Sequence, residues 1–140
     1  GPDETARRLA RHYRPYHAAL ADLAARQART ALVAVHSFTP QLRARPPRPW
    51  HVGVLFARDD RLARPLLARL RAEPDLCVGE NVPYTGYLPG DALDRHASAP
   101  GRPGVLIELR NDLIVTEAQQ AHWAARLAPL LAAARADAGL

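Results

Sequence analysis

The sequence predicts an α/β fold in which helices flank a mainly parallel sheet. Four short apolar segments with the composition of strands alternate with segments whose apolar residues recur every three or four positions. The chain has 140 residues, of which 48% are hydrophobic, so it is long enough to bury a core of its own. We therefore expect a layered fold and a single domain over residues 1–140.

The first helix is predicted from one apolar face, formed by Leu9, Tyr13, Tyr16, Leu20 and Leu23. Pro15 interrupts this pattern, so the helix is expected to kink or to begin late. Residues 31–35 (ALVAV) have the character of a buried strand that is apolar on both faces, as in a parallel sheet. His36 follows this strand directly, and a loop rich in proline and arginine comes next.

A second strand is predicted within residues 50–56, and Asp59 or Asp60 can cap the helix that follows it. That helix carries Leu62, Leu66, Leu67 and Leu70 on one face. The segment DLCVG, residues 75–79, is the third predicted strand. It leads into ENVPYTGYLPGD, a turn-rich loop of the kind that carries functional residues.

The last third of the chain predicts a short helix through Leu93 and His96 and then a fourth strand, VLIEL. Thr116 and Gln119 have the spacing of a capping box at the start of a final helix. The apolar stripe of this helix consists of Trp123, Leu127, Leu130, Leu131 and Ala134.

The chain has a net charge of +5, and all 19 of its basic residues are arginine. They are spread over several segments without a basic stripe interleaved with aromatic residues, which favours a solvated surface over a nucleic-acid interface. The apolar runs are too short to cross a bilayer, and the first residues lack a signal-peptide core. We expect a cytoplasmic protein that binds neither nucleic acid nor membrane. The single Cys77 excludes an internal disulfide, and within an apolar strand it is expected to be an inert core residue rather than a nucleophile.

His36 and Glu108 both lie where a predicted strand ends, and open α/β sheets bind ligands at the carboxyl ends of their strands. A neutral imidazole can bind zinc, and a carboxylate beside the metal can take a proton from water and pass it to a leaving amine. Simpler roles remain open for both residues. His36 can be satisfied by backbone hydrogen bonds, and Glu108 can form an ion pair with an arginine.

Five motifs follow one another along the chain: HSFTP, RPWHVGVLF, LCVGENVPYTGYLPGD, DRHA and VLIELRNDLI. In their order and local sequence they resemble the N-formylglutamate amidohydrolase family, from YRPYHAAL to the last helix. The resemblance implies hydrolysis of the formamide of N-formyl-L-glutamate to formate and glutamate, a step of histidine degradation. It also implies a fold and a site similar to those of zinc carboxypeptidases.

The same resemblance implies a role for each matched residue. His36 corresponds to a zinc ligand and Glu108 to the general base. Arg110 is expected to hold a substrate carboxylate, and Arg43, Arg45 and Arg48 in the loop after His36 are other candidates for this cation. Arg48 and Trp50 are also expected to shape the pocket, Trp50 mainly by packing. The other residues expected in the substrate site are Asn81, Tyr84 and His96.

A catalytic zinc site normally has three protein ligands, and the motifs supply only His36. In the family the other ligands belong to a Glu-His or Asp-His motif in an N-terminal stretch, which does not precede Asp3. We therefore expect the chain to match the C-terminal part of a family member, as a proteolytic or cloned fragment, with a complementing chain, or from a truncated gene. The isolated chain is expected to oligomerise or to need its N-terminal portion. The alternative is a catalytically silent binding or scaffold module derived from the same fold.

Overall fold

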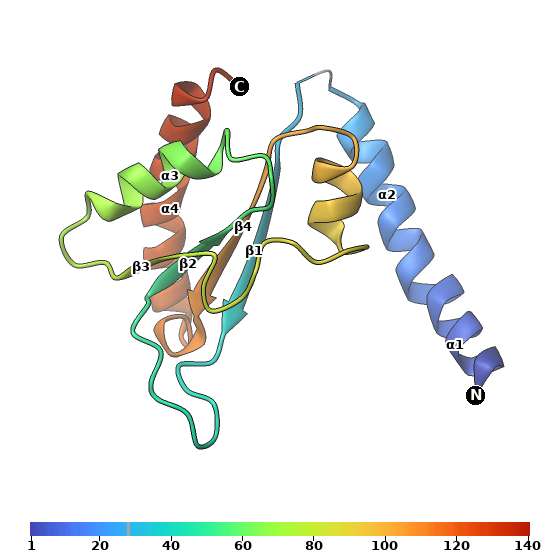
Figure 1. The fold of residues 1–140 in the computed structure, drawn as a ribbon, viewed down its shortest axis with the longest axis horizontal. Helices are drawn as coiled ribbons and strands as arrows, with labels where there is room; N and C mark the ends of the chain where they lie inside the picture. Colours follow the sequence, from blue (N-terminus) through green and yellow to red (C-terminus); the bar gives the residue numbers. More distant parts are fainter. Residues whose placement is uncertain (28) are drawn as a thin grey trace. The chain divides into compact units, whose positions relative to one another are not determined.

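The structure is a computed structural model that describes residues 1–27 and 29–140. It divides into two compact units, Gly1–Thr30 and Ala31–Leu140 (Figure 1). The single-domain interpretation of the sequence stays a prediction. None of the helices in the described ranges has both the length and the apolar composition needed to cross a membrane.

The first unit is helical and consists of α1 (Pro2–Arg8), the π-helical turn η1 (Leu9–Tyr13) and α2 (Arg14–Ala25). The helix does not begin late, because α1 starts at Pro2 and α2 contains Pro15, but a π-helical turn ends two residues before this proline. Proline has no N–H to donate into a regular helix, so a change of hydrogen-bond pattern just before it is a common solution. Four residues of the expected apolar face are more than a third exposed: Leu9, Tyr13, Tyr16 and Leu23.

The second unit holds the sheet. Its elements are, in order, β1 (Leu32–Phe38), β2 (Val52–Leu55), α3 (Ala63–Arg71), β3 (Val78–Glu80), the π-helical turn η2 (Asp94–Ser98), β4 (Gly104–Arg110), the 3-10 turn η3 (Asn111–Leu113) and α4 (Glu117–Asp137). All four predicted strands are present. The first runs further than expected, because it continues through His36 and Ser37 to Phe38. The expectation that it is buried is wrong, because β1 is an edge strand on which Val33 and Val35 are exposed.

The strand order in the sheet is β1-β4-β2-β3. β1 pairs with β4 and β2 pairs with β3 in parallel, whereas the central pair of β2 and β4 is antiparallel. The sheet is therefore mixed, and the predicted parallel arrangement holds for its two outer pairings. The likeness to zinc carboxypeptidases and the absence of an N-terminal part stay predictions.

Helices cover the two faces of the sheet in different ways (Figure 1). On one face α3 and α4 lie side by side against the larger apolar core, to which β4 contributes Val105, Ile107 and Leu109. The other face is covered near η2 by a smaller cluster of Leu55, Leu93, Ala97 and Leu106. Side chains alternate between the faces of a strand, so Glu108 of β4 points to the same face as Leu106.

The starts of α3 and α4 differ in how well the sequence predicts them. At α4 the Thr116 side chain accepts the N–H of Gln119 at 3.2 Å, and the Gln119 side chain accepts the N–H of Thr116 at 2.9 Å, so the predicted capping box is confirmed. At α3 the expected aspartate cap is wrong. The N-cap is Leu62, and Asp59 instead accepts the N–H and guanidinium of Arg61, which lies before the helix.

Candidate functional site

His36 and Glu108 are register partners on the parallel strands β1 and β4. Their side chains point to the same face of the sheet, and His36 Nδ1 lies 3.8 Å from Glu108 Oε1. The structure thus brings together the two residues that the sequence singled out. Both lie two residues before the end of their strand, so the rigid ladder and not a loop fixes their separation.

The two side chains differ sharply in exposure, at 57% for His36 and 6% for Glu108. Glu108 Oε2 is buried and has no hydrogen-bond partner among the described residues. Burial raises the pKa of Glu108, whereas the charges of His36 and Arg48 act in the opposite direction. A buried carboxylate oxygen without a partner is costly in a purely structural role, and it is the form expected of a group that exchanges protons with a ligand.

Arg48 reaches this site from the loop between β1 and β2. Its Nη1 donates to the carbonyl of Thr39 at 3.0 Å and to the hydroxyl of Tyr84 at 3.2 Å. Tyr84 belongs to the turn-rich loop after β3, so Arg48 joins two loops beside Glu108. The simpler role of Glu108 as an arginine ion-pair partner does not occur here, because no arginine in the described chain lies within 4.0 Å of its carboxylate.

Asn81 holds the loop that carries Tyr84 against β2. Its backbone has a positive φ of 50°, and its N–H donates to the carbonyl of Val54 at 3.0 Å. Its side-chain oxygen accepts the N–H of Phe56 at 3.0 Å and of Gly86 at 3.3 Å. The side chain that the resemblance assigns to the substrate is therefore bonded within the protein.

Arg110 and His96 have different surroundings from Arg48. The Arg110 Nε donates to Asp112 at 2.8 Å, and its Nη1 lies within 3.5 Å of three backbone carbonyls in the loop before β2. His96 is buried in η2 between Leu93 and Ala97 of the smaller core cluster, and its carbonyl accepts Arg102 at 3.3 Å.

Sequence reasoning missed two residues that shape the site, Phe38 and Gly53. The guanidinium of Arg48 lies over the buried Phe38 ring, 5.8 Å from its centroid. Gly53 of β2 is the antiparallel partner of Glu108, and a side chain there would collide with the carbonyl of Val82. The signal for Gly53 was its position inside an apolar strand, where glycine often marks a close approach of another backbone.

His36 and Glu108 have only part of the chemistry that a zinc site requires. The imidazole of His36 and the carboxylate beside it have the chemistry of a ligand and a proton acceptor. Within residues 1–27 and 29–140, however, no group of three His, Cys, Asp or Glu side chains is close enough to hold a metal ion. His51, another histidine of the second unit, uses its Nδ1 to accept the N–H of Cys77 at 2.9 Å. For a zinc ion, the described residues therefore supply one candidate ligand, His36, and one candidate base, Glu108.

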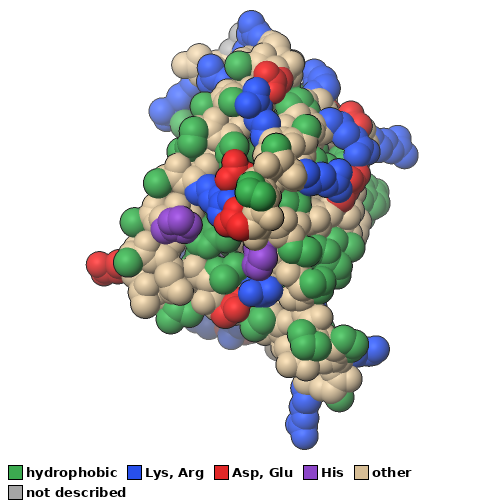
Figure 2. Space-filling model, turned by 90° about the vertical axis from the view of Figure 1, so that its left-hand side faces the viewer, with side chains coloured by type: hydrophobic (Ala, Val, Ile, Leu, Met, Phe, Trp, Pro, Cys, Tyr) green, Lys and Arg blue, Asp and Glu red, His purple; other side chains and the backbone are tan. Residues whose placement is uncertain are grey.

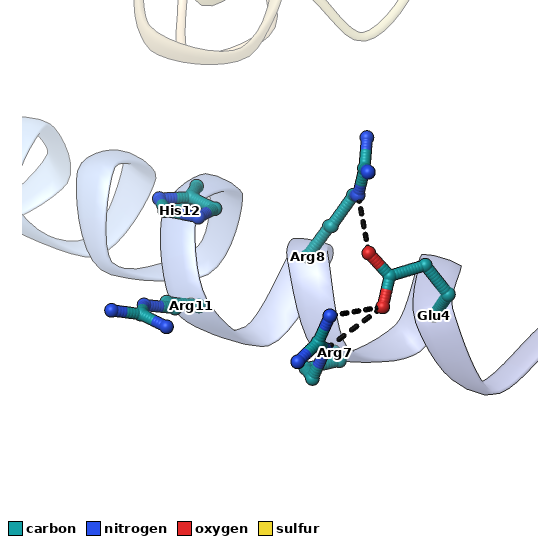
Figure 3. A pocket seen from close by; sticks show the side chains of 5 residues that line it. All are labelled: Glu4, Arg7, Arg8, Arg11 and His12. Atoms are coloured by element: carbon teal, nitrogen blue, oxygen red, sulfur yellow. Dashed lines mark hydrogen bonds and ion pairs between the residues drawn. The ribbon is translucent and has the colours of Figure 1, made fainter.

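The helical unit has a shallow hollow lined by Glu4, Arg7, Arg8, Arg11 and His12 (Figure 3). All five side chains come from one stretch of helix, and Glu4 is already paired with Arg7 and Arg8. The molecular face in Figure 2 likewise shows arginine and acidic side chains next to one another.

The chain matches the sequence model of the N-formylglutamate amidohydrolase family over residues 1–115. Among solved structures, the Atu2144 gene product of Agrobacterium tumefaciens is similar with 34% identity and a TM-score of 0.88, over 100% of this chain and 57% of that one. The N-formylglutamate amidohydrolase of Ralstonia eutropha JMP134 is similar with 25% identity and a TM-score of 0.66, over 98% of this chain and 55% of that one. No curated protein matches. The chain thus spans little more than half the length of these two proteins, and it belongs to the N-formylglutamate amidohydrolase family.

Proposed function

We propose that this chain takes part in the zinc-dependent hydrolysis of N-formyl-L-glutamate to formate and L-glutamate. The observation that carries the proposal is the pair of His36 and Glu108, 3.8 Å apart on neighbouring strands, with the second carboxylate oxygen buried and unbonded within the described chain. Family membership supports an amidohydrolase reaction. The name of the Ralstonia eutropha protein supports this substrate.

In this proposal His36 is one of the zinc ligands, and the others come from the rest of the protein or from another chain. Zinc, when bound, supplies a Lewis acid that polarises the carbonyl group of the substrate. The exposed imidazole of His36 is accessible to such an ion. The small-molecule partner is an N-acyl amino acid.

Glu108 is the proton carrier. It takes a proton from the attacking water, whose oxygen bonds to the formyl carbon. The carbon–nitrogen bond then breaks, and Glu108 gives the proton to the nitrogen of the leaving amine. The products are formate and the free amino group of glutamate. The burial of Glu108 keeps bulk water from competing for the carboxylate.

The experiment measures bound zinc and formate release from N-formyl-L-glutamate by the complete gene product. Glu108→Gln should lower the rate by roughly 10²- to 10⁴-fold while the zinc content stays the same. Glu117→Gln is the matched control, because Glu117 is exposed in the first turn of α4. Unchanged formate release by Glu108→Gln would contradict the proposal.

The described chain does not hold three metal ligands, and this favours one second candidate, a silent binding module on the same scaffold. The same preparation separates the two functions. A complete gene product that binds N-formyl-L-glutamate, contains no zinc and releases no formate would support the binding module.

A further inference from the structure

The guanidinium of Arg48 is held in place by neutral groups. Besides the hydrogen bonds to Thr39 and Tyr84, its Cζ lies 5.8 Å from the centroid of the Phe38 ring and 5.2 Å from that of the Tyr84 ring. Aromatic faces attract a cation and restrict its orientation without neutralising its charge. Arg48 is half-buried, and these contacts orient its guanidinium in the ligand-free chain.

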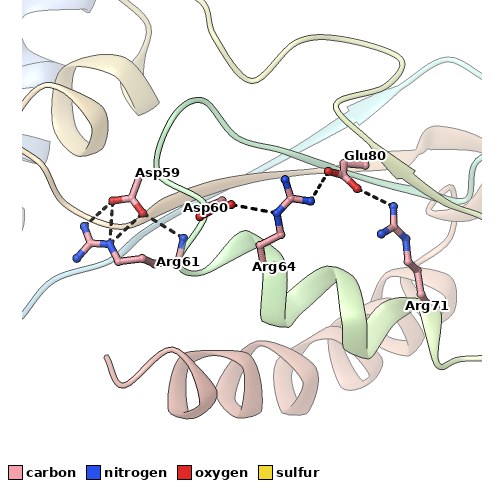
Figure 4. Close-up of polar contacts among 6 residues, drawn as sticks. All are labelled: Asp59, Asp60, Arg61, Arg64, Arg71 and Glu80. Atoms are coloured by element: carbon pink, nitrogen blue, oxygen red, sulfur yellow. Dashed lines mark hydrogen bonds and ion pairs between the residues drawn. The ribbon is translucent and has the colours of Figure 1, made fainter.

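Other arginines of this unit are paired with carboxylates. Figure 4 shows Arg61 with Asp59, Arg64 with Asp60 and Glu80, and Arg71 with Glu80. Arg110 and Arg126, whose side chains are only 17% exposed, also have acidic partners. Within the described ranges Arg48 has no carboxylate within 4.0 Å, and Nη1 is the one guanidinium nitrogen of Arg48 that donates a hydrogen bond.

The half-buried Arg102 also lacks an acidic partner in the described chain, but its surroundings differ. It donates to the carbonyl of His96 and lies before the first residue of β4. Arg48 lies near the other end of that strand, where its charge acts on Glu108.

Arg110 holds the backbone of Arg48. Its Nη1 lies 3.3 Å from the carbonyl of Arg48, 3.4 Å from that of Pro49 and 3.5 Å from that of Trp50. Asp112 neutralises its charge. Arg110 therefore has little capacity left for a substrate, but it determines where the loop places Arg48. Arg43 and Arg45 of the same loop are exposed.

We propose that Arg48 is the residue that selects an anionic substrate, by binding a carboxylate of the N-acyl amino acid, and that Arg110 is a positioning residue that acts through Arg48. The inference rests on the proposed function for the identity of the substrate. An arginine edge with two N–H groups in one plane matches a carboxylate in a bidentate pair. The edge of Arg48 formed by Nε and Nη2 has no partner in the described residues and supplies these donors.

The kinetic experiment compares Arg48→Gln and Arg48→Lys with the native complete gene product. Arg48→Gln should raise KM for N-formyl-L-glutamate on the order of 10- to 100-fold with a smaller change in kcat, because a charged hydrogen-bonded pair is lost. Arg48→Lys should recover part of the loss. Arg43→Gln, in the exposed part of the same loop, should leave KM unchanged. A KM for Arg48→Gln within twofold of native would overturn the inference.

Two analogues, each lacking one of the two carboxylates, identify which carboxylate Arg48 binds. N-formyl-L-glutamine lacks the side-chain charge, and N-formyl-L-isoglutamine lacks the main-chain charge. The native protein should discriminate against one of them, and Arg48→Gln should lose that discrimination. Retention of full discrimination against both analogues by Arg48→Gln would overturn the inference.

The positioning role of Arg110 is tested by a double-mutant cycle. Arg110→Gln should raise KM more than it lowers kcat, Arg110→Lys should restore part of the effect, and Arg48→Gln with Arg110→Gln should be no worse than Arg48→Gln alone. If the KM increases of the two single variants multiply in the double variant, Arg110 does not act through Arg48 and its positioning role is wrong.

Binding of glutarate, measured by calorimetry, separates this inference from the proposed function. Loss of glutarate binding in Arg48→Gln, in a protein that does not hydrolyse N-formyl-L-glutamate, would support the inference and reject the function. If the native protein hydrolyses N-formyl-L-glutamate and Arg48→Gln binds glutarate with unchanged affinity, the function is supported and the inference is rejected.

Discussion

The carbonyl oxygen of Val82 lies 2.5 Å from the position that a Cβ atom would take on Gly53. The same Cβ would be 3.6 Å from the Cβ of Glu108, the partner of Gly53 on β4. The loop after β3 therefore passes directly over β2 beside the candidate base. Only glycine leaves room for this approach.

Gly53→Ala should displace the loop from β2. A methyl group cannot share space with a backbone carbonyl, so we expect a loss of about 1–3 kcal/mol in the free energy of unfolding, together with reduced formate release. Urea unfolding measures the first effect. Gly1→Ala is the control, since nothing lies within 4 Å of its added Cβ. If Gly53→Ala unfolds with the same free energy as the native protein, the loop moves aside without loss of stability, contrary to this prediction.

Asn81 allows a test of substrate contact against loop positioning. Asn81→Ala removes the acceptor for the N–H groups of Phe56 and Gly86, and we expect it to lower stability by about 1–3 kcal/mol along with substrate affinity. Asn81→Asp keeps an acceptor and should retain most of both. If Asn81→Ala keeps full stability and loses only affinity, the side chain contacts the substrate directly.

Arg126 of α4 pairs with Asp75 and Glu73 and lowers the pKa of Asp75 to about 2. Because this pKa is lower in the folded protein than the ordinary value of 3.8, the stabilisation is fully present above pH 3.8 and is lost as the pH falls towards 2. Asp75→Asn should therefore be less stable than native at pH 6, and the difference should shrink as the pH falls through 2 and vanish below it.

Urea titrations at several pH values check this prediction for Asp75. In the Arg126→Gln background, the effect of Asp75→Asn should be much smaller, because only the weaker contributions of the backbone and His51 remain. A stability difference that does not shrink between pH 6 and pH 2 would point to a cause other than this ion pair.

The capping box of α4 should contribute measurably to stability. Thr116→Ala removes the acceptor for the N–H of Gln119, and a loss of about 1 kcal/mol is expected in urea unfolding. Thr116→Ser keeps the hydroxyl and should remain near native. Equal losses in the two variants would assign the effect to the threonine methyl group instead.

Local signals predicted elements well where a single mechanism dominates. The Thr116 and Gln119 pair specified the start of α4 through two reciprocal hydrogen bonds, and the stripe with Trp123 and Leu127 specified its buried face. Asp59 was misleading because Arg61, two residues away, competes for the same carboxylate. The antiparallel pairing of β2 with β4 was not predictable, since apolar strands carry no direction in their composition.

The candidate site was predictable only in part. His36 and Glu108 were visible as polar residues in apolar strands, and parallel pairing explains why they meet. The difference between Arg48 and Arg110 was not visible, because both are arginines beside proposed site residues. Only the carboxylate of Asp112 and the carbonyls around Arg110 distinguish a neutralised cation from one without an acidic partner in the described chain.

The register between β1 and β4 also determines which side chains of the two strands lie opposite each other. A shift of β1 by one residue would bring Val35 or Ser37 opposite Glu108 and turn the imidazole to the other side of the sheet. Substitutions that leave His36 and Glu108 untouched can therefore abolish their pairing if they let β1 slip. The alignment of two backbones is thus as much a requirement of this site as the identity of its side chains.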